Sequence, residues 1–172
     1  MIAPATDIVA LAVFAGALVG AAYCDVRQYL IPNRFPAIIV LAYALFAVGH
    51  PLEQGLWGLA AGLAMLALGT LLFALNVMGG GDTKLLAAVA LWAGPDLAPS
   101  FLFATALAGA AIALAWLSPI RRLMPVAPTR DAMPPVAAIA PTGWRSRLRQ
   151  PVPYGVAIAL GGLDLAATRA FH

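Results

Sequence analysis

The sequence carries very little charge for its length. Only 10% of its 172 residues are charged, whereas 63% are hydrophobic, and the mean hydropathy is +0.92. A water-soluble globular domain has about 25% charged residues, so this composition excludes that class of protein. About six to eight membrane spans of roughly 20 residues fit within this length. We therefore expect one compact integral membrane domain over residues 1–172.

Cysteine and histidine are also scarce. Cys24 is the single cysteine, which excludes an intramolecular disulfide framework and a multi-cysteine zinc site. The sequence contains no phosphate loop, serine nucleophile motif or dinucleotide fingerprint. Its basic residues are dispersed between apolar runs and form no patch for nucleic acid. We therefore expect no cofactor, no metal and no nucleic-acid partner.

Apolar runs dominate what remains, and they predict an all-α polytopic bundle of about six transmembrane helices. The runs cover residues 8–24, 36–49, 56–75, 85–94, 101–117 and 154–167. No Lys or Arg precedes the first run, which indicates a retained helix and not a cleaved signal peptide. Trp57 and Trp92 lie near predicted span ends, where we expect them to anchor the protein at the membrane interface.

The positive charges predict the orientation of the bundle, because cytoplasmic loops are enriched in Lys and Arg. Nine of the ten basic residues fall in alternate loops, and only Arg169 falls on the other side. The nine are Arg27, Arg34, Lys84, Arg121, Arg122, Arg130, Arg145, Arg147 and Arg149. With six spans, those loops are cytoplasmic and both termini lie outside.

Residues 118–153 differ in kind from the rest, since they combine eight prolines with six arginines. So many prolines exclude one continuous helix. We expect a cytoplasmic loop that either lies beside anionic lipid headgroups or contacts a substrate.

Two acidic residues are predicted to meet at the cytoplasmic side. Asp25 ends the first span and Asp82 begins the fourth, and an even number of crossings separates them. The other acidic residues of the predicted bundle map near the outer side. They are Asp7, Glu53, Asp96 and Asp164.

A pair of carboxylates can hydrolyse an amide without a metal. One ionised Asp takes a proton from water, while its protonated partner polarises the carbonyl. At about 5 Å and an effective dielectric of about 20, repulsion between two ionised groups is roughly 3 kcal/mol, which favours one shared proton. The alternative is structural: Asp82 caps a helix, the preceding glycines form a turn, and Asp25 is a surface charge near Arg27.

The two motifs together resemble the type IV prepilin peptidase family of membrane aspartyl proteases. Asp25 followed by Leu30-Ile31-Pro32-Asn33 is similar to the family's first motif. The second, Gly-x-Gly-Asp-x-Lys, is matched by Gly79-Gly80-Gly81-Asp82-Thr83-Lys84-Leu85-Leu86. A third likeness is Pro153-Tyr154-Gly155-Val156-Ala157, which opens the sixth run.

The resemblance implies an activity, a location and partners. The catalytic aspartates carry over onto Asp25 and Asp82. The implied reaction is hydrolysis after a Gly that ends the short basic leader of a prepilin or pseudopilin, at the cytoplasmic face of the bacterial inner membrane. The sequence lacks the cysteine-bearing insertion and methyltransferase portion of longer members, so no methylation is expected. It resembles the short peptidases that serve tight-adherence (Flp) pili.

Further residues of the two motifs are expected to shape the site or contact substrate. Gly79, Gly80 and Gly81 allow close backbone approach and a sharp helix start. Lys84 either favours ionisation of the aspartate pair or anchors its helix at the headgroups. Pro32 and Asn33 are expected to set the turn into the second helix.

Two rival functions stay open at this point. A small ion- or proton-coupled transporter would use buried charges in the middle of its spans. A structural subunit of a pilus secretion platform would need neither Asp25 nor Asp82 to be ionisable.

Overall fold

The computed structural model describes residues 5–117 and 153–171. All regular elements in these two ranges are α-helices, which confirms the predicted all-α class. They are α1 (Ala5–Gln28), α2 (Arg34–Val48), α3 (Leu52–Ala74), α4 (Gly80–Leu117) and α6 (Tyr154–Phe171). The predicted basic loop 118–153 lies outside the described residues, except for Pro153.

Three of these helices, α1, α3 and α4, are long and apolar enough to cross a membrane. α2 is a shorter apolar helix. Helices suit a membrane because each backbone N–H and C=O in their interior is paired within the same segment. The fold is therefore that of a helical membrane protein.

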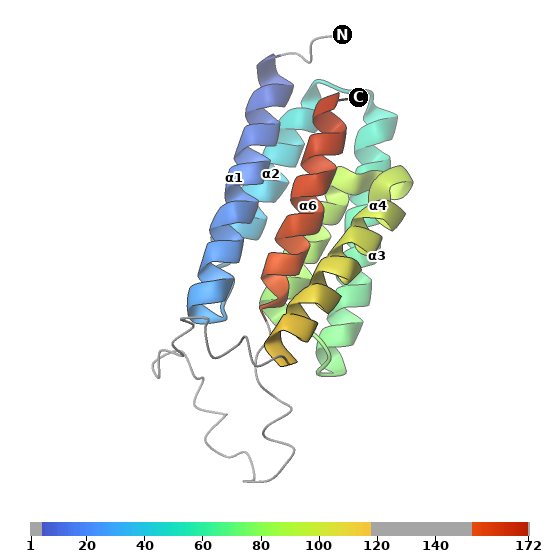
Figure 1. Cartoon of the computed structure of the whole chain (residues 1–172). Coiled ribbons are helices and arrows are strands. Elements are labelled where there is room, and N and C mark those ends of the chain that lie inside the picture. The colour runs from blue at the N-terminus through green and yellow to red at the C-terminus, as the bar shows by residue number, and fades with distance from the viewer. Residues whose placement is uncertain (1–4, 118–152, 172) are drawn as a thin grey trace.

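α4 consists of two segments that meet at a sharp reversal. Gly94 has φ 60° and ψ −175°, far from helical values, and Pro95 follows it directly. Proline suits the first position of a helix because its φ is fixed and its missing N–H would be unpaired there anyway. Figure 1 shows α4 running along the bundle and then turning back. The sequence predicted an interruption over residues 95–100; helix instead resumes immediately after Gly94.

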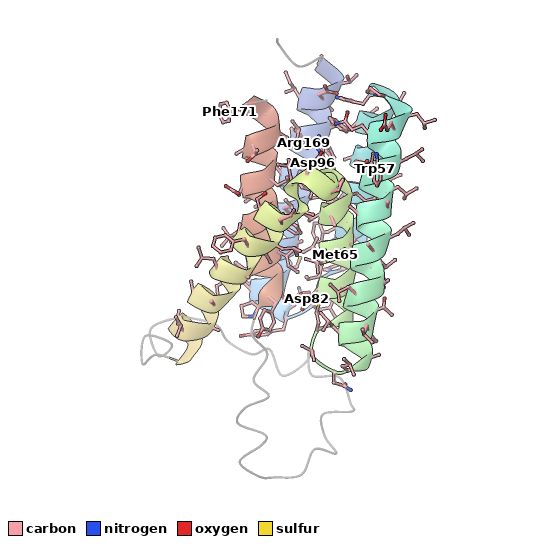
Figure 2. All side chains as sticks on the ribbon, turned by 90° about the vertical axis from the view of Figure 1, so that its right-hand side faces the viewer. Trp57, Met65, Asp82, Asp96, Arg169 and Phe171 are labelled. Atoms are coloured by element: carbon pink, nitrogen blue, oxygen red, sulfur yellow. The ribbon has the colours of Figure 1, made fainter. Side chains whose placement is uncertain are left out.

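The helices form one bundle with two distinct ends. α1 packs against α2 and α6, while α4 packs against α2, α3 and α6. The C-terminal end of α1 and the N-terminal ends of α2, α4 and α6 lie together at one end of the bundle (Figure 1). Figure 2 labels Asp82 near this end and Arg169 near the other. We call them the Asp82 end and the Arg169 end.

Trp92 lies in the core of the bundle, so its predicted role as an interfacial anchor is wrong. Its side chain is 1% exposed and stacks on Phe14 with ring centroids 4.6 Å apart. Its indole N–H donates to the carbonyl of Ile39 at 3.2 Å. Burial is favourable here because the one polar atom of the side chain has a partner. Trp57, by contrast, is 56% exposed.

Candidate active site

Asp25 lies in the last turns of α1 and is almost completely buried, with 5% of its surface exposed. The backbone N–H groups of Gly155 and Val156, at the start of α6, donate hydrogen bonds to its carboxylate. These donors are among the first N–H groups of a helix, which have no partner within the helix and attract negative charge. The oxygen Oδ2 is buried and has no hydrogen-bond partner among the described residues.

Asp82 lies in the first turn of α4 and is partly buried. Its carboxylate accepts a hydrogen bond from the backbone N–H of Gly79, the residue before the helix. This arrangement matches the capping box, in which the third helical residue reaches back to the cap residue. Asp82 therefore caps α4, as the structural alternative predicts, and this hydrogen bond fixes its carboxylate at the start of the helix.

Thr83 secures the start of α4 against α3. Its backbone N–H and its hydroxyl both donate to the Gly79 carbonyl, at 3.0 and 3.1 Å. The hydroxyl also lies 3.1 Å from the carbonyl of Gly69 in α3. The glycine at position 69 permits this contact, because a β-carbon there would lie 2.8 Å from the Thr83 methyl group. The helix that carries Asp82 is thus held by its neighbour.

The two aspartates are brought together at the Asp82 end, as the even number of crossings predicts. Asp82 lies close enough to Asp25 for a direct Coulombic interaction. Ile31, which lies between α1 and α2 in sequence, packs against the starts of α4 and α6. A β-carbon at Gly81 would lie 3.2 Å from Ile31 Cβ, and one at Gly155 would lie 2.6 Å from Ile31 Cδ1. The starts of α4 and α6 therefore converge on one buried side chain.

Lys84 and Asn33 link the two sequence motifs directly. The ammonium group of Lys84 donates to the side-chain oxygen of Asn33 at 2.9 Å. Asn33 is the residue before α2, yet its side chain makes no capping bond to that helix. Both side chains are exposed. Lys84 thus has a partner that neither predicted role anticipated: it ties the start of α4 to the α1–α2 turn.

The remaining motif residues support this turn and the helix mouth. The carbonyl of Pro32 accepts the backbone N–H of Phe35 at 3.1 Å, which closes the predicted turn into α2. Gly80 and Gly81 are the first two residues of α4. A β-carbon at Gly79 would lie 3.0 Å from Asp82 Oδ2, so the glycine leaves room for that carboxylate.

Sequence reasoning did not assign Gly155, Val156 and Ile31 to the site. The segment Pro153-Tyr154-Gly155 was recognised as similar to the family, but it predicted only the start of a helix and no contact with Asp25. A β-carbon on Gly155 would lie 2.8 Å from Asp25 Oδ2. The glycine is therefore needed for the close approach of α6 to the carboxylate, which no local pattern in the sequence reveals.

The arrangement has the elements of an acid–base pair. Two carboxylates that interact in a poorly solvated place favour a state with one proton between them. Such a pair can activate water on one side and polarise a carbonyl on the other. No group of three His, Cys, Asp or Glu side chains suited to a metal ion occurs in residues 5–117 and 153–171.

Comparison with known protein families gives a match. The model of the type IV leader peptidase family matches residues 12–114, a range that contains Asp25 and Asp82. No curated protein and no solved structure matches the chain.

Proposed function

Because the chain belongs to the type IV leader peptidase family, we propose that it is a membrane aspartyl endopeptidase for prepilins and pseudopilins. It cuts after the Gly that ends the short basic leader of these precursors. Asp25 and Asp82 are its catalytic residues. By its short form, we assign it to the peptidases that serve Flp pili.

One observation supports this proposal most strongly: the interaction of Asp25 with Asp82 at one end of the bundle. Within residues 5–117 and 153–171, neither aspartate has a basic side chain as its hydrogen-bond partner; backbone N–H groups of Gly155, Val156 and Gly79 serve instead. A structural ion pair would need an opposite charge, whereas an acid–base pair needs the two carboxyl groups to share a proton.

The proposed reaction uses the two carboxyl groups in sequence. The ionised one removes a proton from water, and the water oxygen bonds to the carbonyl carbon of the scissile peptide. The protonated one donates its proton toward the carbonyl oxygen. Collapse of the tetrahedral intermediate breaks the C–N bond. The amine nitrogen takes the proton that the first carboxyl group gained from water, and the other carboxylate takes back a hydroxyl proton of the intermediate as the new carbonyl forms. The pair ends with one proton, as it began.

The proposed orientation places the Asp82 end at the cytoplasmic face of the bacterial inner membrane. Arg27, Arg34 and Lys84 all belong to this end, whereas Arg169 lies at the other (Figure 2). Basic residues are retained on the cytoplasmic side of membrane proteins. With six spans, both termini then lie outside. The basic leader of a precursor is cytoplasmic before cleavage, so the site and the scissile bond share one face.

Cleavage of a candidate precursor tests the function. We expect the purified protein in lipid to release the leader of a short prepilin, with a new N-terminus directly after the leader Gly, as measured by intact mass. A precursor whose leader Gly is replaced by Val is the matched control. It should stay uncut, because the proposed cleavage requires Gly directly before the scissile bond. Cleavage of both precursors at other bonds would contradict the assignment.

The Lys84–Asn33 hydrogen bond yields a second expected result. Lys84→Met and Asn33→Ala each remove one partner of the same bond, and each should lower the stability by about 1 kcal/mol. Cleavage should fall less than about tenfold, since neither residue belongs to the acid–base pair. Thermal unfolding and cleavage rates measure both effects.

The double variant separates a shared bond from two independent roles. If the bond is shared, the double variant Lys84→Met with Asn33→Ala should lose no more stability and no more cleavage activity than either single variant. Additive losses would show that the two side chains act separately.

A further inference from the structure

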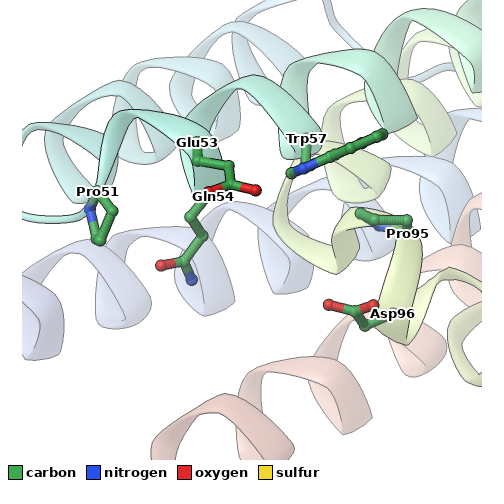
Figure 3. A pocket seen from close by; sticks show the side chains of 6 residues that line it. All are labelled: Pro51, Glu53, Gln54, Trp57, Pro95 and Asp96. Atoms are coloured by element: carbon green, nitrogen blue, oxygen red, sulfur yellow. The ribbon is translucent and has the colours of Figure 1, made fainter.

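The Arg169 end contains a cavity that the proposed reaction does not use. Its volume is about 770 Å³, and residues from all five helices and from the α2–α3 turn line it. A second cavity of about 590 Å³ lies between α3 and the reversal of α4, and Figure 3 shows its lining residues. Gln54 and Asp96 line both cavities, so the two adjoin. Figure 2 places Asp96 and Arg169 far along the bundle from Asp82.

Asp7 gives this cavity an unsatisfied acceptor. The side chain lines the cavity and is 5% exposed. Its Oδ2 lies 3.7 Å from His50 Nε2, whereas Oδ1 is buried and has no partner among the described residues. His50 Nδ1 lies 2.9 Å from the Phe46 carbonyl, which can only accept, so Nδ1 carries a proton. A buried carboxylate oxygen without a donor is costly, and an N–H group is its natural complement.

Arg169 gives the same cavity an unsatisfied donor. Its guanidinium donates to the Trp92 carbonyl at 2.8 Å and lies over the Phe46 ring at 5.7 Å. Asp96 interacts with it through space. Its Nε is nonetheless buried without a partner among the described residues. Guanidinium groups bind phosphate well because their planar donors match its oxygens.

We propose that the cavity binds the headgroup of a phospholipid of the ethanolamine class. The ammonium group donates to Asp7 Oδ1, and the phosphate accepts from Arg169 Nε. One zwitterionic ligand thus satisfies both groups without adding net charge to the cavity. Leu11, Leu97 and Phe171 add apolar lining for the adjacent glycerol and acyl groups.

The position of the cavity indicates that this headgroup belongs to a membrane lipid. It opens at one end of a bundle whose helices have membrane-spanning length, and lipid headgroups lie at that level. A choline headgroup has the same charges but no N–H donor, and a glycerol headgroup has no ammonium group. The proposal therefore predicts a preference among lipids with identical acyl chains.

Native mass spectrometry of the purified full chain tests this preference. The protein is mixed with equal amounts of dioleoyl phosphatidylethanolamine, its N-methyl and N,N-dimethyl derivatives, and the phosphatidylcholine. We expect binding to fall along this series, with about tenfold between its ends, because the donors to Asp7 disappear. Equal binding along the series would overturn the proposal, as would equal or tighter binding of dioleoyl phosphatidylglycerol.

A variant pair links the preference to Asp7. Asp7→Asn should weaken the preference for ethanolamine over choline, because a neutral amide oxygen binds an ammonium group less strongly than a carboxylate does, while prepilin cleavage stays at the parental rate. Asp164→Asn is the matched control, because it removes a carboxylate from the exposed face of α6, and it should keep the preference. If Asp7→Asn kept the preference, the ammonium group would not be bound at Asp7. The lipid series needs no variant, so the proposal is tested even if Asp7→Asn fails to fold.

Discussion

Asp82→Asn is expected to lower the rate of prepilin cleavage by about 10³-fold or more, with the protein still folded. General acid–base groups contribute roughly 10² to 10⁴ in rate, and an amide can neither accept nor supply the shared proton. The fold should survive because the amide oxygen still accepts the Gly79 N–H that caps α4. Initial rates by mass spectrometry and thermal unfolding in lipid measure the two effects.

Asp25→Asn should behave in the same way, since its amide oxygen can still accept the N–H groups of Gly155 and Val156. The double variant should lose no more activity than either single one, because residues that act as one unit are not additive. Asp164→Asn, which removes an exposed carboxylate of α6, serves as the control and should cleave normally. Parental activity in either site variant would show that the carboxylate concerned is not catalytic.

Gly155→Ala is the second change with a large expected effect, and it should separate activity from stability. The added methyl group would lie 2.8 Å from Asp25 Oδ2 and 2.6 Å from Ile31 Cδ1. Both atoms are ends of side chains and can move aside, so the fold is retained. The movement, however, displaces the Asp25 carboxylate, and a misplacement of about 1 Å costs roughly 10²-fold in rate. We expect cleavage to fall by about that factor.

Gly16→Ala in α1 is the matched control for this change, since nothing lies within 4 Å of its added methyl group. It should leave cleavage unchanged and stabilise α1 slightly, by at most about 1 kcal/mol, because alanine favours helix more than glycine. If Gly155→Ala cleaved at the parental rate, close approach of α6 to Asp25 would not be needed. A large fall in melting temperature would instead indicate a packing role.

The main features of the fold are predictable from the sequence because they depend on composition and on the order of apolar runs and charged residues along the chain. Long apolar runs require helices in a membrane, and the number of crossings between Asp25 and Asp82 places both at one end. Neither inference needs a single side-chain contact. The structure places both aspartates accordingly.

Features that depend on three-dimensional packing were not predictable. Trp92 lies near a predicted span end, yet its indole is buried because it packs against Phe14 of α1 and against Tyr43 and Phe46 of α2. The contact between Asp7 and His50 joins α1 to the α2–α3 turn, and nothing in either local sequence indicates it. Gly155 contacts Asp25 only because α6 packs against α1.

The dependence of Asp25 on α6 has a consequence for biosynthesis. A ribosome makes α1 long before α6, so Asp25 enters the membrane without the Gly155 and Val156 N–H groups that later bind it. Nascent chains that do not yet include α6 contain both aspartates but lack the two N–H groups that donate to Asp25. Synthesis itself thus delays assembly of the proposed site until α6 has joined the bundle.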